Sequence, residues 1–184
     1  MFTALVLLTM SQAPECRTSG LQTACGFHCR AELDQVKCAQ TPQGTCERVE
    51  GKLVCWDPPE EVRLHAPSSR PDCRMKYGEI ACGFSCGTSE TQLACAATPW
   101  GVCATRDNRV SCWDPSPAVI HNFAAKGLGG ARCLQTNSSV ACGWDCKESY
   151  RDVKCAQTPL GRCSIFEGKI VCFDPPIPPV NHAS

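Results

Sequence analysis

The chain has 184 residues, with 18 Lys and Arg, 18 Asp and Glu, and 18 cysteines. Its zero formal net charge argues against a general binder of nucleic acid or anionic membrane, because both kinds of binding need an excess of basic residues. So many cysteines are rare outside disulfide scaffolds and thiolate metal proteins. Two Tyr, six Phe and four Trp are also too few to fill one large core.

The first 13 residues are typical of an export signal. Residues 2–10 are apolar, and Ser11, Gln12 and Ala13 form the small-x-small pattern that signal peptidase prefers. An N-terminal hydrophobic strand is the alternative, because the segment is short and has no Lys or Arg before its apolar part. Disulfides persist in oxidising compartments, which favours export. We therefore expect a secreted or periplasmic/cell-surface protein without a membrane span, since no apolar run reaches the roughly 18 residues that a spanning helix needs.

The cysteines form three sets of six with identical spacing. Within each set the gaps are eight, three, eight, seven and eight residues. The neighbouring residues repeat as well, as in ACGFHC, ACGFSC and ACGWDC, and such internal repetition predicts three tandem modules. The expected disulfide cysteines are Cys16, Cys25, Cys29, Cys38, Cys46, Cys55, Cys73, Cys82, Cys86, Cys95, Cys103, Cys112, Cys133, Cys142, Cys146, Cys155, Cys163 and Cys172.

The repeats also set the expected domain boundaries. The first linker lies in a proline-rich stretch and should be extended, whereas the second runs into Gly-Leu-Gly-Gly and should be flexible. The predicted segments are a signal peptide at 1–13, module 1 at 14–59, a linker at 60–70, module 2 at 71–116, a flexible linker at 117–130, module 3 at 131–176 and a tail at 177–184.

Each module is expected to be a small disulfide-rich, mainly β unit of short antiparallel hairpins. The clearest hairpin has Glu50-Gly51 as its two-residue turn, which brings Cys46 opposite Cys55. A unit this small buries too little apolar surface to be stable without cross-links. Six cysteines allow about 15 pairings. The hairpin-local set (16–25, 29–38 and 46–55) leads, and the others stay open.

The same turn position in modules 2 and 3 holds Asp107-Asn108 and Glu167-Gly168. Asn and Gly tolerate the positive φ that such turns need. No segment shows a convincing 3.6-residue periodicity.

Metal binding through thiolates is an alternative to disulfides, although the Cys-x2-Cys pairs of structural zinc sites are absent. His65, His121 and His182 recur nine or ten residues after the last cysteine of each module. They are either one imidazole ligand per repeat or side chains of a solvated linker, and the second interpretation is favoured because no partner ligand recurs beside them. We expect no cofactor.

Catalysis is not expected. A hydrolase needs a nucleophile, a base and an orienting group in one cleft, and no such combination of Ser, His and an acid recurs across the repeats. The aromatic residue after each last cysteine is Trp56, Trp113 or Phe173. These three residues are expected to be core aromatics, with an exposed stacking surface as the alternative.

A four-residue segment, Thr-Pro-x-Gly, recurs with a different third residue in each module, namely Gln43, Trp100 or Leu160. The constant frame and variable tip suggest a displayed recognition residue. The alternative is a tolerant loop whose Trp folds back onto the module.

The repeated pattern CGxxC … KCAQTPxGxC … GKxVCxDPP resembles cysteine-rich repeats of exported bacterial proteins of unknown function. The likeness covers nearly the whole chain after residue 13 and implies export and modularity. The loop from Cys38 to Cys46 is more loosely similar to the binding loop of Bowman–Birk protease inhibitors, but it lacks that loop's Ser and its paired prolines.

The sequence therefore predicts an exported, non-enzymatic interaction protein. Its expected partner is another extracellular or cell-surface protein or polymer, and not nucleic acid. The alternatives are a protease inhibitor that acts through the Thr-Pro-x-Gly loops and a thiolate metal-binding protein.

Overall fold

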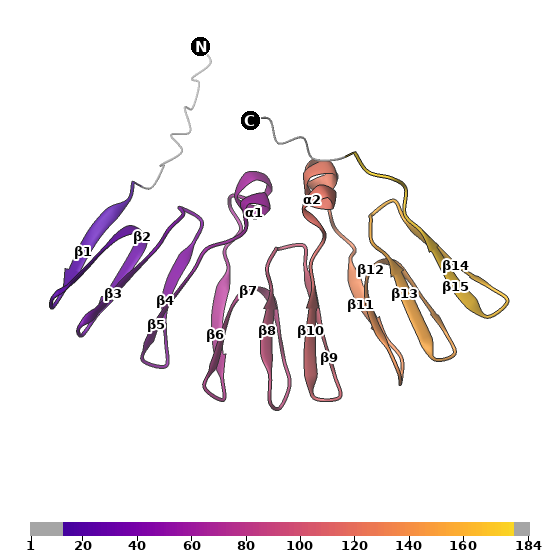
Figure 1. The fold of residues 1–184 in the computed structure, drawn as a ribbon, viewed down its shortest axis with the longest axis horizontal. Helices are drawn as coiled ribbons and strands as arrows, with labels where there is room; N and C mark the ends of the chain where they lie inside the picture. Colours follow the sequence, from indigo (N-terminus) through magenta and orange to yellow (C-terminus); the bar gives the residue numbers. More distant parts are fainter. Residues whose placement is uncertain (1–12, 179–184) are drawn as a thin grey trace, which may run out of the picture. The chain divides into compact units, whose positions relative to one another are not determined.

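The computed structural model describes residues 13–178, and the chain divides into two compact units, Met1–Asp57 and Pro58–Ser184. The first unit holds module 1, and the second holds modules 2 and 3 (Figure 1). The proposed export signal lies almost wholly outside the described residues. Among the described residues, no helix combines the length and apolar character needed to cross a bilayer.

Every module is a three-stranded antiparallel sheet followed by a two-stranded hairpin. Module 1 contains β1 (Glu15–Ser19), β2 (Gln22–Glu32), β3 (Gln35–Ala39), β4 (Thr45–Val49) and β5 (Lys52–Trp56). Module 2 contains β6 (Asp72–Lys76), β7 (Glu79–Thr88), β8 (Leu93–Ala96), β9 (Val102–Arg106) and β10 (Arg109–Trp113). Module 3 contains β11 (Arg132–Gln135), β12 (Val140–Ser149), β13 (Asp152–Ala156), β14 (Arg162–Phe166) and β15 (Lys169–Phe173). The predicted small, disulfide-rich, mainly β fold is confirmed.

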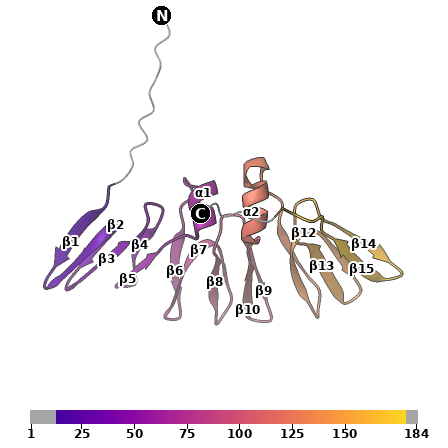
Figure 2. The same ribbon diagram turned by 45° about the horizontal axis from the view of Figure 1, so that its top comes forward.

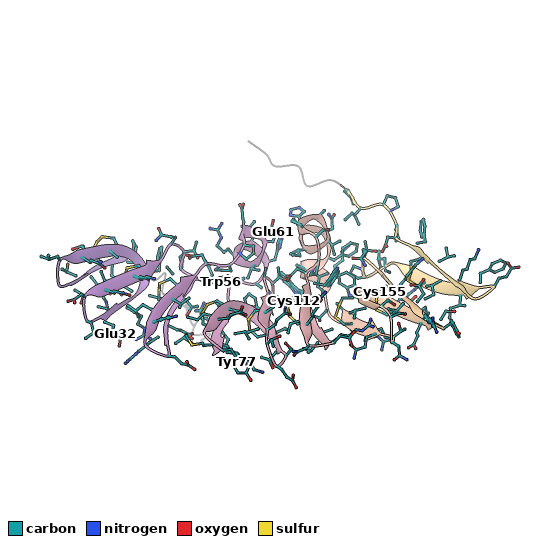
Figure 3. The ribbon with its side chains drawn as sticks, turned by 60° about the horizontal axis from the view of Figure 1, so that its bottom comes forward. Glu32, Trp56, Glu61, Tyr77, Cys112 and Cys155 are labelled. Atoms are coloured by element: carbon teal, nitrogen blue, oxygen red, sulfur yellow. A yellow bond between two sulfur atoms is a disulfide. The ribbon has the colours of Figure 1, made fainter. Side chains whose placement is uncertain are left out.

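All 18 cysteines lie in the described part of the chain, and they form nine disulfides. Every bond joins cysteines nine residues apart, one on each strand of a hairpin. In the last hairpin of module 2, for example, Cys103 lies directly opposite Cys112. Figure 3 shows these bonds in yellow against the ribbon, with Cys112 and Cys155 labelled. The hairpin-local pairing that led the possible pairings is confirmed.

The two-residue turns explain why these strands pair in this register. Glu50 and Gly51 both have positive φ, at 44° and 82°, and the turns centred on Asp107 and Glu167 behave in the same way. Positive φ at both turn positions matches the twist of the flanking strands. Gly and Asn adopt this conformation readily, so the sequence signal for these hairpins was sound.

A bulge interrupts the middle strand of each sheet, between the two cysteines of the Cys-x3-Cys pair. In module 3 the register shifts between Trp144 and Lys147, and Asp145 at the bulge has a φ of 41°. Gly143, just before the bulge, has a φ of 145°, and a Cβ atom there would lie 2.2 Å from the carbonyl oxygen of Ala156. Only a residue without a side chain allows the strands to approach this closely.

Short helices follow modules 1 and 2, where the sequence led us to expect an extended linker and a flexible linker. The helix α1 (Glu60–His65) replaces the extended linker expected there. The helix α2 (Pro117–Phe123) continues into a short 3₁₀ segment, η1 (Ala124–Lys126). The Ser116 hydroxyl accepts a hydrogen bond from the Val119 N–H, and Pro117 occupies the first helical position. This Ser-Pro start is a known helix signal that outweighed the weak periodicity of seven residues.

The second helix builds the largest apolar cluster of the second unit. Val119, Ile120, Leu128 and Trp144 are all at most 5% exposed, and they form what we call the α2 cluster. Partly buried residues around it include Trp100 and Trp113 of module 2, so helix and modules share one core. Figure 2 shows α2 in the chain between the strands of module 2 and those of module 3. The segment 117–130, which we expected to be an open flexible linker, therefore packs modules 2 and 3 together.

Replacing Gly143 with Ala should lower the free energy of unfolding by about 2 kcal/mol or more, because the new methyl group meets the Ala156 carbonyl in a conformation that Ala resists. Urea unfolding of the oxidised protein measures this loss. The control is Gly129→Ala, since a Cβ atom at Gly129 would meet nothing within 4 Å. Equal stability of the two variants would contradict the close-approach argument.

Candidate functional site

The Thr-Pro-x-Gly turns are held in place by the aspartate that follows each module's last cysteine. In module 2, Asp114 Oδ1 accepts hydrogen bonds from the backbone N–H and the hydroxyl of Thr98, at 2.8 and 2.7 Å. Asp114 Oδ2 accepts from the Ala97 N–H at 2.9 Å. The Gly101 N–H donates to the Thr98 carbonyl at 3.1 Å and closes the turn. Asp57 and Asp174 make the same set of bonds in the other modules.

This network determines what the turn can present to a partner. Thr98 is only 4% exposed, so its side chain cannot enter another protein's pocket. A Cβ atom at Gly101 would lie 2.2 Å from Asp114 Oδ1, so the carboxylate fills the place of a side chain there. From the sequence we interpreted the aspartate only as a turn former. Its larger role, accepting hydrogen bonds from residues 16 and 17 positions earlier in the chain, was missed.

The three variable tip residues have different surroundings. Gln43 is half-buried, and Leu160 is 61% exposed. Trp100 is half-buried and packs against the α2 cluster, as in the alternative of a Trp that folds back onto the protein. A recognition role for these three tips stays a prediction, and Leu160 is the most accessible of them.

The aromatic residues that close the modules also differ. The rings of Trp113 and Trp144 meet edge to face with centroids 5.2 Å apart. The Trp113 indole N–H donates to Gln157 Oε1 at 2.9 Å, so this residue joins module 2 to module 3. Phe173, its equivalent in module 3, is 66% exposed. Core packing, expected for both, is therefore wrong for Phe173.

Phe173 belongs to an apolar surface on the last hairpin. Side chains alternate between the two faces of a strand, so Phe166, Val171 and Phe173 lie on one face of β14–β15, opposite the buried Ile170. They are 69, 60 and 66% exposed. We call these three residues the trailing face of module 3.

The equivalent face of module 2 is already engaged. Arg106, Ser111 and Trp113 occupy the matching positions in β9–β10. Trp113 contacts module 3 as described above, and the Arg106 guanidinium donates to the Asn137 carbonyl of module 3. A comparison of the repeats could have found the trailing face. The positions of Arg106 and Ser111 in module 2 are occupied by Phe166 and Val171 in module 3.

Two of the three recurring histidines meet in the second unit. The rings of His65 on α1 and His121 on α2 lie edge to face with centroids 5.5 Å apart. His182 lies outside the described residues. Among residues 13–178, no group of three or more His, Cys, Asp or Glu side chains is placed to hold a metal ion. His65 and His121 thus form a contact between two helices. The interpretation of these histidines as side chains of a solvated linker did not include this contact.

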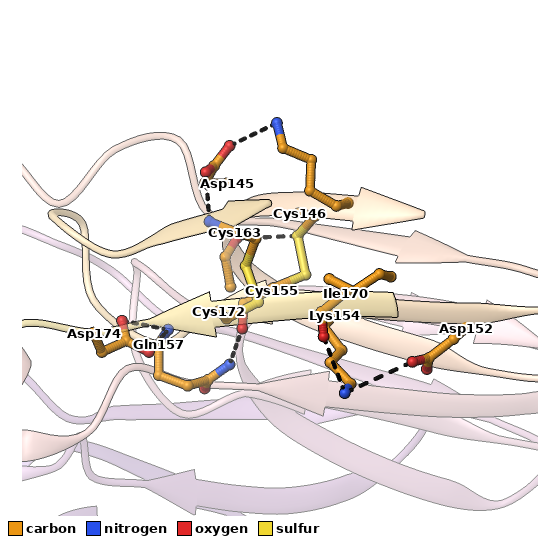
Figure 4. Close-up of a disulfide and its surroundings, with 12 residues drawn as sticks. Asp145, Cys146, Asp152, Lys154, Cys155, Gln157, Cys163, Ile170, Cys172 and Asp174 are labelled. Atoms are coloured by element: carbon orange, nitrogen blue, oxygen red, sulfur yellow. Dashed lines mark hydrogen bonds and ion pairs between the residues drawn. A yellow bond between two sulfur atoms is a disulfide. The ribbon is translucent and has the colours of Figure 1, made fainter. Parts of the chain in front are cut away.

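The bulge residue of module 3 carries a carboxylate with a specific partner. Asp145 Oδ2 accepts a hydrogen bond from the Cys163 N–H at 2.8 Å, and Asp145 Oδ1 lies 3.0 Å from Lys147 Nζ (Figure 4). The Cys163 N–H, followed by the Lys147 ammonium, holds the pKa of Asp145 below its ordinary value of 3.8. This carboxylate therefore ties the three-stranded sheet to the last hairpin.

Comparisons with protein-family models, with curated proteins and with solved structures give no match for this chain. The repeated cysteine-rich module itself is confirmed by the nine disulfides and the three copies of one sheet-and-hairpin fold.

Asp114→Asn should lower the free energy of unfolding by about 1–3 kcal/mol, because the new amide NH2 faces a backbone N–H and the charge-assisted bonds are lost. Thermal unfolding of the oxidised variant measures the effect. Asp107→Asn is the control, since the Asp107 side chain is 79% exposed in a hairpin turn. A wild-type melting temperature for Asp114→Asn would show that the network adds little stability.

Asp145 should make module 3 sensitive to acid. The pKa of Asp145 is lowered in the folded state, so its contribution to stability is present above the ordinary value of 3.8 and is lost as the pH falls through the lower folded value. Asp145→Asn should therefore flatten the decline of the melting temperature below about pH 4. Asp152→Asn, in the same module, serves as the matched control. Parallel acid profiles of Asp145→Asn and wild type would contradict the prediction.

Proposed function

We propose that this protein is an exported, non-enzymatic interaction protein that binds another extracellular protein through the trailing face of module 3. The observation that carries the proposal is the exposure of Phe166, Val171 and Phe173 together on one hairpin face. Contiguous exposed apolar side chains on a small protein mark interaction surfaces more often than isolated ones do.

The surroundings of the trailing face fit this role. Arg162 and Lys169 point to the same side of β14–β15 by strand alternation, and both are exposed. An apolar centre with a charged rim is the usual layout of a protein–protein interface, in which Phe and Arg are enriched. The Cys163–Cys172 bond holds the hairpin in one register before any partner arrives. Binding to such a pre-organised surface has a low ordering cost.

The disulfides support the proposed location outside the cytoplasm. Nine disulfides fit an oxidising compartment. Secretion, or retention in the periplasm or at the cell surface, is the finer proposal. It agrees with the likeness of the repeats to those of exported bacterial proteins and with the apolar first segment.

The absence of catalysis is part of the proposal. The polar side chains that recur in all modules are engaged in structural hydrogen bonds, as Thr98 and Asp114 illustrate. The protease-inhibitor alternative has less support because Thr98 is buried and Trp100 packs on the α2 cluster. The thiolate-metal alternative has less support because the 18 cysteines are paired.

The proposal predicts that a native extracellular fraction contains a component that wild-type protein retains on a matrix. The double variant Phe166→Glu/Phe173→Glu should lose this component, because two charges replace the apolar centre. After identification and purification, the component should bind recombinant wild-type protein at least about tenfold more tightly than the double variant.

The control is Ile165→Thr, which changes the neighbouring position to the residue that module 2 carries there as Thr105. It should retain the component as wild type does. If a component bound wild type and the double variant equally, the binding site would have to lie outside the trailing face. If the retained component were a polysaccharide, the proposal would be wrong about the class of partner.

A further inference from the structure

We propose that the trailing face of module 3 docks on module 1 of a second copy of this chain, so that chains associate head to tail. This inference rests on the proposed function and names the partner of the same surface. It is carried by the contact that module 2 makes with module 3 inside one chain.

That internal contact provides the template. Trp113 from the last hairpin of module 2 meets Trp144 on the middle strand of module 3 and donates to Gln157. Trp144 is only 5% exposed as a result of this and the surrounding contacts. The contact therefore joins two complementary surfaces: an aromatic residue on the last hairpin of one module, and an aromatic residue with a nearby Gln on the first sheet of the next.

Within the described part of the first unit, residues 13–57, nothing covers the second of these surfaces on module 1. Phe27 is the equivalent of Trp144, but it is half-exposed and lines an open hollow of about 260 Å³ together with Ala13, Glu15 and His28. Gln40 is the equivalent of Gln157, and both are exposed enough to accept a hydrogen bond from a neighbour. We call Phe27 and Gln40 the leading face of module 1.

The exposure of the first disulfide shows the same difference between module 1 and module 3. Cys16 and Cys25 of module 1 are both exposed. The equivalent Cys133 and Cys142 of module 3, which follows a packed neighbour, are half-buried. Among residues 13–57, the leading side of module 1 thus lacks the cover that module 3 has.

The two free faces match in chemistry as well as in position. Phe173 stands where Trp113 stands in the template, and Phe166 and Val171 add apolar surface that module 2 does not have. Arg162 lies beside the trailing face, and Glu15, which forms an exposed ion pair with Arg17, lies beside Phe27. Two different surfaces that complement each other generate a head-to-tail contact, which extends to further copies unless it closes into a ring.

The test is sedimentation velocity of the purified, oxidised, secreted protein over a wide range of concentration. Wild type should show a weight-average mass that rises with concentration. Phe166→Glu/Phe173→Glu and Phe27→Glu should each weaken self-association by about tenfold or more. Ile165→Thr should associate as wild type does.

Mixing the two blocked variants provides the sharper result. The double variant keeps a free leading face, and Phe27→Glu keeps a free trailing face. Each alone should be monomeric, whereas an equimolar mixture should form dimers that do not grow further. A symmetric dimer through one shared face would give no such rescue, and that outcome would overturn the head-to-tail arrangement.

A gain-of-function variant keeps the test independent of damage to the fold. Phe173→Trp restores the module 2 residue, whose indole N–H can donate to Gln40 as Trp113 donates to Gln157. It should tighten association, and no change would count against the proposed contact. Wild type that stays monomeric at the highest concentration would overturn the inference. If the trailing face then still retained an extracellular component, the proposed function would stand without this partner.

Discussion

The disulfide between facing strands of one hairpin is the bond on which the rest of the structure depends. Each bond closes a loop of about ten residues, which in the chain-entropy model contributes about 3 kcal/mol. Within one module three such bonds replace a core that the few large side chains could not build. They fix the register of the hairpins, and with it which side chains point inward and which point outward. The Asp–turn network and small clusters such as Ala156, Cys163 and Ile170 then join the hairpins without any further covalent link.

The sequence predicted most of the secondary structure because its signals were local. Glu50-Gly51 and its equivalents require a two-residue turn, and the equal cysteine spacing places partners opposite each other across it. The helices α1 and α2 were missed, since six or seven residues are too few to show a helical period. Their burial depends on tertiary contacts of Val62, Val119 and Ile120 that no local pattern reveals.

The candidate surface was harder to predict for a different reason. Trp113 and Phe173 occupy the same repeat position, and one is engaged while the other is exposed. What separates them is that Trp113 contacts module 3, whereas Phe173 contacts no further module among the described residues. The tip residues Gln43, Trp100 and Leu160 show the same effect, because a constant frame surrounds side chains whose exposure depends on the neighbours. A comparison of repeats predicts which surface a residue position contacts in a neighbouring module. The structure is needed to find the positions at which that contact is not made.

The order of the disulfides has a consequence for synthesis. Along the chain the first cysteine bonds the second and the third bonds the fourth, and this order continues through all nine bonds. No bond encloses another or waits for a distant partner. If the chain enters an oxidising compartment N-terminus first, as the proposed export implies, each correct pair is complete before the next cysteine arrives. Simple oxidation in order of appearance therefore yields the native pairing, and a disulfide isomerase has little to correct.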